Sequence, residues 1–403
     1  MTTLADVRSA RERIRGGVVL TPVVPALALP RELPCRLHLK LENAQRTGSF
    51  KDRGALNRLA QLSDEERARG LVTASAGNHA QAVAYHGQRL GIDVEVVMPE
   101  QTPLIKVVNT QRFGAAVRFH GATLSDSMEE ARRLEGEEGR VFIHAFDDDA
   151  VIAGQGTVGL ELLEQVPDLT AVVAPIGGGG LISGISVAIR EQRPDVCIYG
   201  VEAAAAPSAL ASRRAGHPVH IETTETIADG IAVKRVGERT FPLIERYVEE
   251  IVAVDEEQIA GSVHLLLEHQ KTLAEGAGAA PLAALLAGLL PLRDDDVVVM
   301  VLSGGNIDVN LMERIVDRGR VDDGRLTRLS VTVPDRPGNL ARLTALVARA
   351  GANVLEVAHT RAAPDVSVRQ VEIALQLETR SAEHRGEIIE RLQEAGYVVR
   401  RTV

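Results

Sequence analysis

The sequence has few cysteines, and the two that it has lie far apart. Cys35 and Cys197 form no C-x-x-C pair and no metal-ligand spacing. A disulfide framework and a cysteine-based metal site are therefore excluded. This usage is typical of a protein kept reduced in the cytoplasm, which is the compartment that we predict.

Long apolar runs and an excess of basic residues are also missing. No uninterrupted apolar stretch reaches about 18 residues, the length that a membrane span needs. Residues 1–15 are charged and lack the apolar core of a signal peptide. The formal net charge is −10, from 45 basic and 55 acidic residues, without a dense basic stripe. We therefore expect neither a membrane nor a nucleic acid as a partner.

The sequence does contain core material for two or three domains, with 45% apolar residues in a chain of 403. In its first three-quarters, β-rich runs alternate with runs of helical spacing, which predicts an α/β fold with helices on both faces of a sheet. Ligands collect at the carboxyl ends of the strands in such folds. The predicted strands are Gly70–Thr73, Val94–Met98, Ala116–Phe119, Arg140–Ile143, Ala171–Ile176, Val196–Val201 and Asp296–Leu302. The predicted helices are Gln81–Leu90, Leu104–Phe113, Leu124–Leu134, Leu181–Gln192 and a buried one within Ala277–Leu292.

The composition changes near residue 315. Residues 317–325 are charged and contain glycine, so we interpret residues 316–327 as a linker. Residues 328–403 follow a β-α-β-β-α-β order, which is the ferredoxin-like arrangement. Its predicted strands are Arg328–Val333, Asn353–Thr360, Val366–Glu378 and Tyr397–Arg401, and its predicted helices are Gly338–Ala350 and Ala382–Ala395.

The stretch Thr47–Gly54 places one lysine, Lys51, among small and polar residues before a helical run. A lysine in a recess has a lowered pKa, and its free amine is then a nucleophile that can form a Schiff base with a carbonyl cofactor. The alternative is a solvated lysine at the start of a helix. The neighbouring motifs favour the first interpretation.

Three predicted strands end in loops that suit a ligand. The loop at residues 75–80 opens a helix, so its free backbone N–H groups suit a carboxylate, although a plain capped helix is an alternative. Gly177–Gly180 form a run of four glycines whose amides can hold a phosphate. A dinucleotide site is a weaker alternative, because Ser183 stands where its fingerprint needs glycine. The third loop begins with Ser303, whose hydroxyl can meet the edge of a bound ring.

Taken together, five motifs in this order resemble the fold-type II pyridoxal-phosphate enzymes, which are similar to the tryptophan synthase β subunit. Within them the chain resembles the threonine ammonia-lyases, also called threonine dehydratases, over residues 5–315. The motifs are Lys-x-Glu-Asn at 40–43, Gly-Ser-Phe-Lys-Asp-Arg-Gly at 48–54, Ser-Ala-Gly-Asn-His-Ala at 75–80, Gly-Gly-Gly-Gly-Leu at 177–181 and Ser-Gly-Gly-Asn at 303–306. Residues 333–340 and 351–354 resemble an ACT regulatory domain, which usually binds amino acids at paired copies.

The resemblance implies three regions and a set of roles. A two-lobed catalytic region spans residues 1–315, with a smaller lobe at about 40–147, and the linker leads to an ACT domain at 328–403. Lys51 holds pyridoxal 5′-phosphate and removes the Cα proton of the substrate. The implied cofactor contacts are Asn78 with the ring 3-oxygen, Ser303 with the ring nitrogen, and Gly177, Gly178, Gly179, Gly180 and Leu181 with the phosphate. The substrate carboxylate is expected on Ser75, Ala76, Gly77, Asn78 and His79, and an amino-acid effector on Gly338, Asn339, Leu340 and Asn353.

The implied reaction is deamination of L-threonine to 2-oxobutanoate and ammonia, and of L-serine to pyruvate. Alternatives are a serine dehydratase or racemase, and a non-catalytic amino-acid sensor that has kept the fold. Ala76 argues against a racemase, because the related racemases typically carry a serine there as a proton donor. An intact Lys51 argues against the sensor. The family also implies a homodimer or homotetramer.

The sequence leaves the roles of two acidic residues, Glu202 and Glu275, undecided. Some relatives bind a divalent cation through the region of Glu202, but Ser208 stands where a second carboxylate is needed, so we expect no metal. The alternative for Glu202 is a solvated carboxylate. The turn that begins at Glu275 either borders the cofactor ring or only starts a helix.

Overall fold

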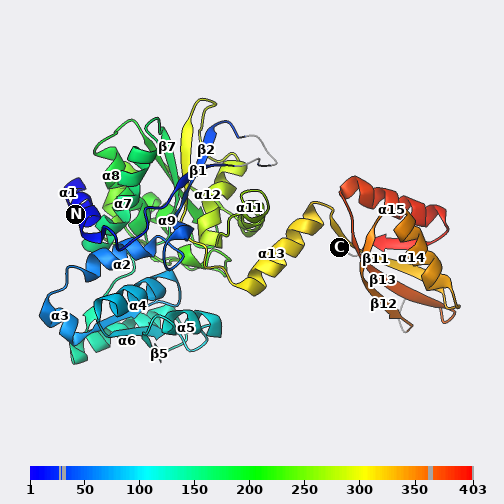
Figure 1. Cartoon of the computed structure of the whole chain (residues 1–403), viewed down its shortest axis with the longest axis horizontal. Coiled ribbons are helices and arrows are strands. Elements are labelled where there is room, and N and C mark those ends of the chain that lie inside the picture. The colour runs from blue at the N-terminus through cyan, green and yellow to red at the C-terminus, as the bar shows by residue number, and fades with distance from the viewer. Residues whose placement is uncertain (27–28, 30–32, 362–365, 402–403) are drawn as a thin grey trace. The chain divides into compact units, whose positions relative to one another are not determined.

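The computed structural model describes residues 1–26, 29, 33–361 and 366–401, in two compact units, Met1–Asp308 and Val309–Val403 (Figure 1). Parts of the predicted ACT domain, residues 362–365 and 402–403, lie outside the described residues. Among the described residues, no helix is long and apolar enough to cross a membrane.

The first unit is built on a six-stranded sheet in the order β1-β2-β10-β7-β8-β9. All neighbours are parallel except β1 and β2, and the strands at the centre are buried along their length. Such burial explains their continuous apolar sequences. The strands are β1 (Val23–Pro25), β2 (Arg36–Leu41), β7 (Ala171–Pro175), β8 (Cys197–Ala203), β9 (Glu250–Val254) and β10 (Val297–Leu302). The helices beside them are α1 (Leu4–Ile14), α7 (Asp149–Gln165), α8 (Gly180–Arg190), α9 (Ser208–Ala215), α10 (Thr240–Tyr247), α11 (Glu256–Glu268) and α12 (Gly276–Leu286).

A smaller parallel sheet, in the order β5-β4-β3-β6, forms the second lobe of this unit. Successive residues of its strands face two different cores. Leu71 belongs to the same core as Val83 of α4, whereas Val72 belongs to the same core as Leu134 of α6. Helices therefore cover both faces, as the alternating sequence predicts. The elements are β3 (Leu71–Ala74), β4 (Val94–Met98), β5 (Ala116–Phe119), β6 (Val141–Phe142), α3 (Asp64–Arg69), α4 (Asn78–Leu90), α5 (Leu104–Gln111) and α6 (Leu124–Glu138).

Helix α2 (Lys51–Leu59) connects the two lobes, because it packs on α7 of the large lobe and on α4 of the small one. Strand β2 belongs to the large sheet, so the sheet of the smaller lobe covers only residues 71–142 of the predicted range 40–147. Two short 3-10 helices, Glu42–Ala44 and Asp229–Ile231, complete the unit.

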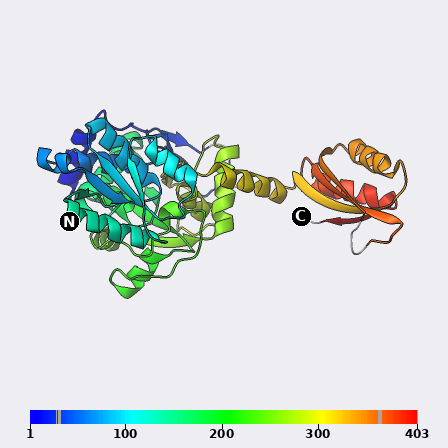
Figure 2. The same ribbon diagram turned by 90° about the horizontal axis from the view of Figure 1, so that it is seen from below.

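The second unit carries a four-stranded antiparallel sheet in the order β12-β13-β11-β14, drawn in orange to red in Figure 2. Leu343 of α14 and Ile388 of α15 share one core with the sheet residue Ile373, so both helices cover the same face. The order matches the ferredoxin-like prediction. The elements are α13 (Val309–Asp322), β11 (Leu326–Pro334), α14 (Asn339–Arg349), β12 (Asn353–Thr360), β13 (Gln370–Glu378), α15 (Ala382–Glu394) and β14 (Val398–Arg401).

The structure differs from the predicted elements at several boundaries. Residues 316–322 of the predicted linker form the end of helix α13. They continue a helix whose apolar residues Leu311, Met312, Ile315 and Val316 recur at helical spacing. Strand β13 begins at Gln370 rather than at residue 366, and α4 begins three residues earlier than predicted. Ten elements were not predicted from the sequence: α1, α3, α7, α9, α10, α11, α13, β1, β2 and β9.

Candidate active site

One cavity of about 330 Å³ opens at the carboxyl ends of strands β3, β7 and β10. It contains every catalytic, cofactor-binding and substrate-binding residue that the sequence predicts. They are Lys51, Ser75, Ala76, Gly77, Asn78, His79, Gly177, Gly178, Gly179, Gly180, Leu181 and Ser303. The fold thus brings together segments that are more than two hundred residues apart in the chain.

Lys51 is the first residue of α2, and the loop before it is fixed by the end of β10. The backbone N–H of Phe50 donates to the carbonyl of Ser303 at 3.0 Å, and Gly305 donates to the carbonyl of Gly48 at 2.9 Å. Gly48 has φ +80°, and a Cβ there would lie 2.6 Å from Asn306 Oδ1, so this position requires glycine. The pairing places Lys51 and Ser303 at the same end of the cavity.

The amine of Lys51 is held by a backbone carbonyl beside an aromatic ring. Its Nζ donates to the carbonyl of Ala145 at 2.8 Å and lies 5.0 Å from the centre of the Phe50 ring. Burial lowers the pKa of Lys51 to about 8, and the charge of Glu275 opposes this effect. A substantial fraction of the amine is therefore neutral near pH 8, as a nucleophile or base requires.

Buried ion pairs fasten α2 to the large lobe. Arg53, which is fully buried, donates to both oxygens of Glu42 at 2.7 and 2.8 Å and to both oxygens of Glu161 at 2.6 and 2.8 Å. Lys40 Nζ also donates to Glu161, at 2.6 Å. Two cations and two anions thus balance within the core, two residues along the helix from Lys51.

The loop from Ser75 to His79 leads from β3 into α4 and lines the cavity at a helix N-terminus, a place that favours an anion. The N–H groups of Ser75 and Gly77 donate to the Val97 carbonyl and to Ser75 Oγ, so the carboxylate would rely on the other N–H groups of the loop. His79 contacts the carbonyl of Ile143 through Nε2 at 3.1 Å, outside its own loop. Burial, followed by the charge of Lys51, lowers the pKa of His79 to about 3, so its ring is neutral. Because a carbonyl only accepts, the neutral ring carries its proton on Nε2.

The four glycines lead from β7 into α8, with Gly179 at φ +91°. A Cβ on Gly178 would lie 2.3 Å from the ring carbons of Phe146. The carbonyl of Gly178 accepts from Thr240 Oγ1 at 2.7 Å, so this carbonyl is bonded within the protein. The loop therefore offers backbone N–H groups and no side chain, which suits a phosphate.

Two polar residues were given no role from the sequence: Asn306, which lines the cavity, and His144, which is outside its lining. Asn306 donates through Nδ2 to Asn78 Oδ1 at 2.8 Å, and Asn78 donates through Nδ2 to Glu275 Oε1 at 2.7 Å. His144 accepts at Nδ1 from the backbone N–H groups of Phe146 and Asp147, and so shapes the loop that meets Lys51. Asn306 stands in the quoted Ser-Gly-Gly-Asn motif, whereas nothing in the sequence indicates the Ala145 carbonyl.

Glu202 is buried rather than solvated, contrary to the alternative considered for it. Its two oxygens accept from the N–H groups of Ala209 and Leu210 at 2.7 and 2.9 Å, at the start of α9. Burial raises the pKa of Glu202 to about 7. This carboxylate therefore anchors a helix N-terminus in the described structure.

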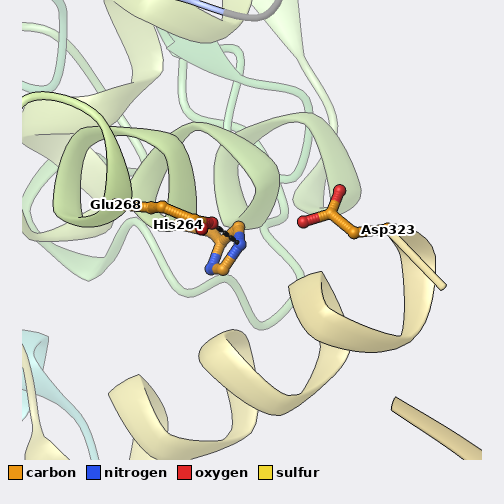
Figure 3. A group of neighbouring side chains, drawn as sticks. All are labelled: His264, Glu268 and Asp323. Atoms are coloured by element: carbon orange, nitrogen blue, oxygen red, sulfur yellow. Dashed lines mark ion pairs between the residues drawn. The ribbon is translucent and has the colours of Figure 1, made fainter. Parts of the chain in front are cut away.

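A histidine and a carboxylate also meet on helix α11. His264 Nε2 lies 2.9 Å from Glu268 Oε2, one helical turn along (Figure 3). Asp323, which the same figure draws, belongs to the C-terminal unit. Within its own unit the His264–Glu268 contact is an ordinary i,i+4 pair.

The predicted effector residues lie in the second unit. Gly338 has φ +87° and precedes α14, and Asn339 Nδ2 donates to the carbonyl of Pro334 at 2.7 Å. Leu340 is 39% exposed. Asn353 begins β12, and its Nδ2 donates to Glu378 at 3.3 Å. Gly338, Asn339 and Leu340 are consecutive residues at the turn that leads into α14. The role of all four residues in effector binding stays a prediction.

Comparison with known proteins defines the class to which this fold and site belong. Residues 14–304 match the model of the pyridoxal-phosphate dependent enzyme family, and residues 327–396 match the ACT domain model. The chain belongs to the family of pyridoxal-phosphate dependent enzymes.

Particular relatives narrow this class. The chain is 47% identical over 400 residues, 99% of each chain, to the L-threonine ammonia-lyase of Thermotoga maritima. The structure resembles threonine deaminase isoform 2 of Solanum lycopersicum with a TM-score of 0.74 and 34% identity, over 79% of this chain and 87% of that one. It also resembles maize serine racemase with a TM-score of 0.74 and 34% identity, over 78% of this chain and 96% of that one.

The cavity fits pyridoxal 5′-phosphate, the cofactor of this family. Lys51 supplies a partly buried amine of lowered pKa for its aldehyde. The glycine loop supplies N–H groups for its phosphate, and Ser303, only 1% exposed, supplies a neutral polar group in the cavity lining. A neutral partner stabilises a protonated ring nitrogen less than a carboxylate would.

Proposed function

We propose that this chain is a pyridoxal-phosphate-dependent ammonia-lyase that converts L-threonine to 2-oxobutanoate and ammonia, and also L-serine to pyruvate and ammonia. One observation carries the proposal: Lys51, whose amine has a lowered pKa, lines the same cavity as the Ser75–His79 loop and the glycine loop. The relatives named as threonine ammonia-lyase and threonine deaminase support the substrate.

The protein's own residues divide the work of this reaction. Pyridoxal 5′-phosphate, held by Lys51 and the glycine loop, would supply an electron sink for the Cα of an amino acid, so that the Cα proton could be removed. The amine of Lys51 takes that proton, and the N–H groups at Ser75–His79 hold the carboxylate. The β-hydroxyl leaves as water after it takes up one proton, which balances the proton removed from Cα. A water molecule is consumed later when ammonia is released. The net products, 2-oxobutanoate and ammonia, account for every atom of threonine.

A serine racemase is the second candidate, because the maize enzyme has the same fold and 34% identity. Racemisation needs a proton donor on the face of the substrate opposite Lys51. Ala76 lines the cavity in the loop where the racemases that the sequence resembles typically carry a serine, and a methyl group donates no proton. This favours elimination. A non-catalytic sensor is disfavoured by the intact Lys51.

A substrate panel tests the proposal. The purified enzyme is supplied with L-threonine, L-serine and D-serine, and the release of 2-oxo acid and ammonia is measured. We expect release from the two L-amino acids and none from D-serine, and loss of at least about a thousandfold in kcat for Lys51→Ala. Conversion of L-serine to D-serine without pyruvate would favour the racemase instead.

We further propose that the ACT domain binds a branched-chain amino acid, isoleucine or valine, and that this changes the activity. The ACT family match supports regulation by an amino acid, and the effector site is assigned to Gly338, Asn339, Leu340 and Asn353. A homodimer or homotetramer is proposed from the family. The free thiols of Cys35 and Cys197 fit a reducing compartment such as the cytoplasm.

A further inference from the structure

Glu275 is a buried acid at the cavity that the proposed chemistry leaves without a role. It stands at the residue before α12, but among the described residues its side chain makes no capping hydrogen bond to that helix. Glu275 is only 5% exposed and lines the cavity with Lys51. A carboxylate in this place costs free energy unless it has partners, so its contacts indicate its function.

The contacts of Glu275 fix the amide of Asn78. Glu275 Oε1 accepts from Asn78 Nδ2 at 2.7 Å, and Asn306 Nδ2 donates to Asn78 Oδ1 at 2.8 Å and to the carbonyl of Thr47 at 2.7 Å. A carboxylate only accepts, so it decides which end of the Asn78 amide faces it. One N–H of Asn78 remains, and the cavity is where it can be used.

The space for Glu275 is provided by a glycine. A Cβ on Gly304 would lie 2.4 Å from Glu275 Oε1, so any larger residue there would displace the carboxylate. The backbone N–H of Glu275 donates to the carbonyl of Gly304 at 3.1 Å. The Ser-Gly-Gly-Asn loop therefore positions Glu275 as well as the lysine loop.

The charged groups around Glu275 make it responsive to pH. Burial, followed by the charge of Asp229, raises the pKa of Glu275 to about 7, and Asn78 and Lys106 oppose this effect. Lys51 faces it across the cavity, Asp308 also lines the cavity, and His79 is neutral. Loss of the Glu275 charge would therefore lower the pKa of the Lys51 nitrogen, because an anion favours a nearby cation.

We propose that Glu275 is a positioning residue of this enzyme, which orients Asn78 toward the cofactor ring and supplies the negative charge that stabilises a protonated nitrogen on Lys51. The role rests on the proposed function in that Lys51 carries the cofactor. The side chain of Glu275 thus has two tasks. Its Oε1 atom fixes the amide of Asn78, and its negative charge favours the protonated form of the Lys51 nitrogen.

The test compares Glu275→Gln with the wild-type holoenzyme without substrate. The visible absorbance of the bound cofactor is followed from about pH 6 to 9, and the cofactor dissociation constant is measured by dialysis against pyridoxal 5′-phosphate. Glu275→Gln should lower the pH midpoint of the absorbance change by about one pH unit or more. Because glutamine keeps an oxygen for Asn78, the dissociation constant should rise less than in Glu275→Ala, where we expect about a tenfold rise.

Two further variants keep the test decisive. Glu202→Gln removes another buried carboxylate of raised pKa, outside the cavity, and should leave the midpoint unchanged. If Glu275→Gln fails to fold, Glu275→Asp replaces it in the test. Aspartate keeps the negative charge but is shorter, so the pH midpoint of the absorbance change should stay the same while the cofactor dissociation constant rises. An unchanged midpoint in Glu275→Gln, or an unchanged dissociation constant in Glu275→Ala or Glu275→Asp, overturns the inference. Failure of the wild type to deaminate L-threonine would instead refute the proposed function, and the spectral result does not depend on it.

Discussion

At the scale of single residues, the lowered pKa of Lys51 is the property on which the chemistry depends. The amine sits among the Phe50 ring, the Ala145 carbonyl and the glycine loop, so its charged form loses hydration. The neutral form is the one that attacks an aldehyde and removes a proton. The surroundings of this lysine, more than its identity, make it reactive.

This property predicts how the apoenzyme captures its cofactor. The rate of capture should rise with pH as Lys51 loses its proton, with a midpoint near the pKa of about 8. Stopped-flow absorbance after mixing apoenzyme with pyridoxal 5′-phosphate measures it. Lys51→Ala should show no slow spectral change at any pH, and a wild-type midpoint near that of free lysine, about 10.4, would contradict the prediction.

At the scale of elements, α2 is held by the ion pairs of Arg53. Replacing Arg53 by methionine leaves Glu42 and Glu161 buried without their main partner. We expect the free energy of unfolding to fall by about 3–5 kcal/mol in denaturant titrations. Arg15→Met removes an exposed pair with Glu12, so it should cost at most about 1 kcal/mol. Equal effects of the two changes would refute this account of α2.

The turn between β7 and α8 gives a second prediction at this scale. In Gly178→Ala, the new Cβ would meet the Phe146 ring at 2.3 Å, so the loop must shift and its N–H groups lose their alignment. The cofactor dissociation constant should rise about tenfold or more, because several N–H contacts to the phosphate weaken together. Gly136→Ala, in α6 with nothing within 4 Å of the added Cβ, is the control that should not change it. A normal dissociation constant in Gly178→Ala would argue against a phosphate at this loop.

At the scale of the whole molecule, two units with separate cores share one chain. The proposed regulation requires that an amino acid bound to the second unit changes the activity of the first. Leu340→Asp places a charge in the predicted effector turn, at a residue that is 39% exposed, so folding should survive.

We expect isoleucine or valine to change the rate of 2-oxobutanoate release in the wild-type enzyme and to do so at least about tenfold less effectively in Leu340→Asp. Val368→Asp, a fully exposed site in the same unit, should respond as the wild type does. Titration of activity against each amino acid measures both. The same response in all three proteins would remove the predicted turn from the regulation.

Local patterns made part of the fold predictable from the sequence. Strands such as Val94–Met98 and helices such as Leu104–Gln111 are short, periodic and bounded by turn residues, so their positions were predicted closely. Helix α7 was not, because residues 151–162 are all buried and leave no polar face to give a period. Residues 316–322, the second half of helix α13, were interpreted as part of a linker because of their charge and glycine.

The sequence alone determined the chemistry of the site, since a lysine, an anion loop, a glycine loop and a serine in one order are a property of the chain itself. Only the tertiary structure decided how these parts work together. Strand β10 lies between β2 and β7 although it comes last of the three in the chain, and this order brings Ser303 and Asn306 beside Lys51 and Asn78. The lowered pKa of Lys51 and the role inferred for Glu275 follow from burial and from contacts across distant segments, which no local pattern records.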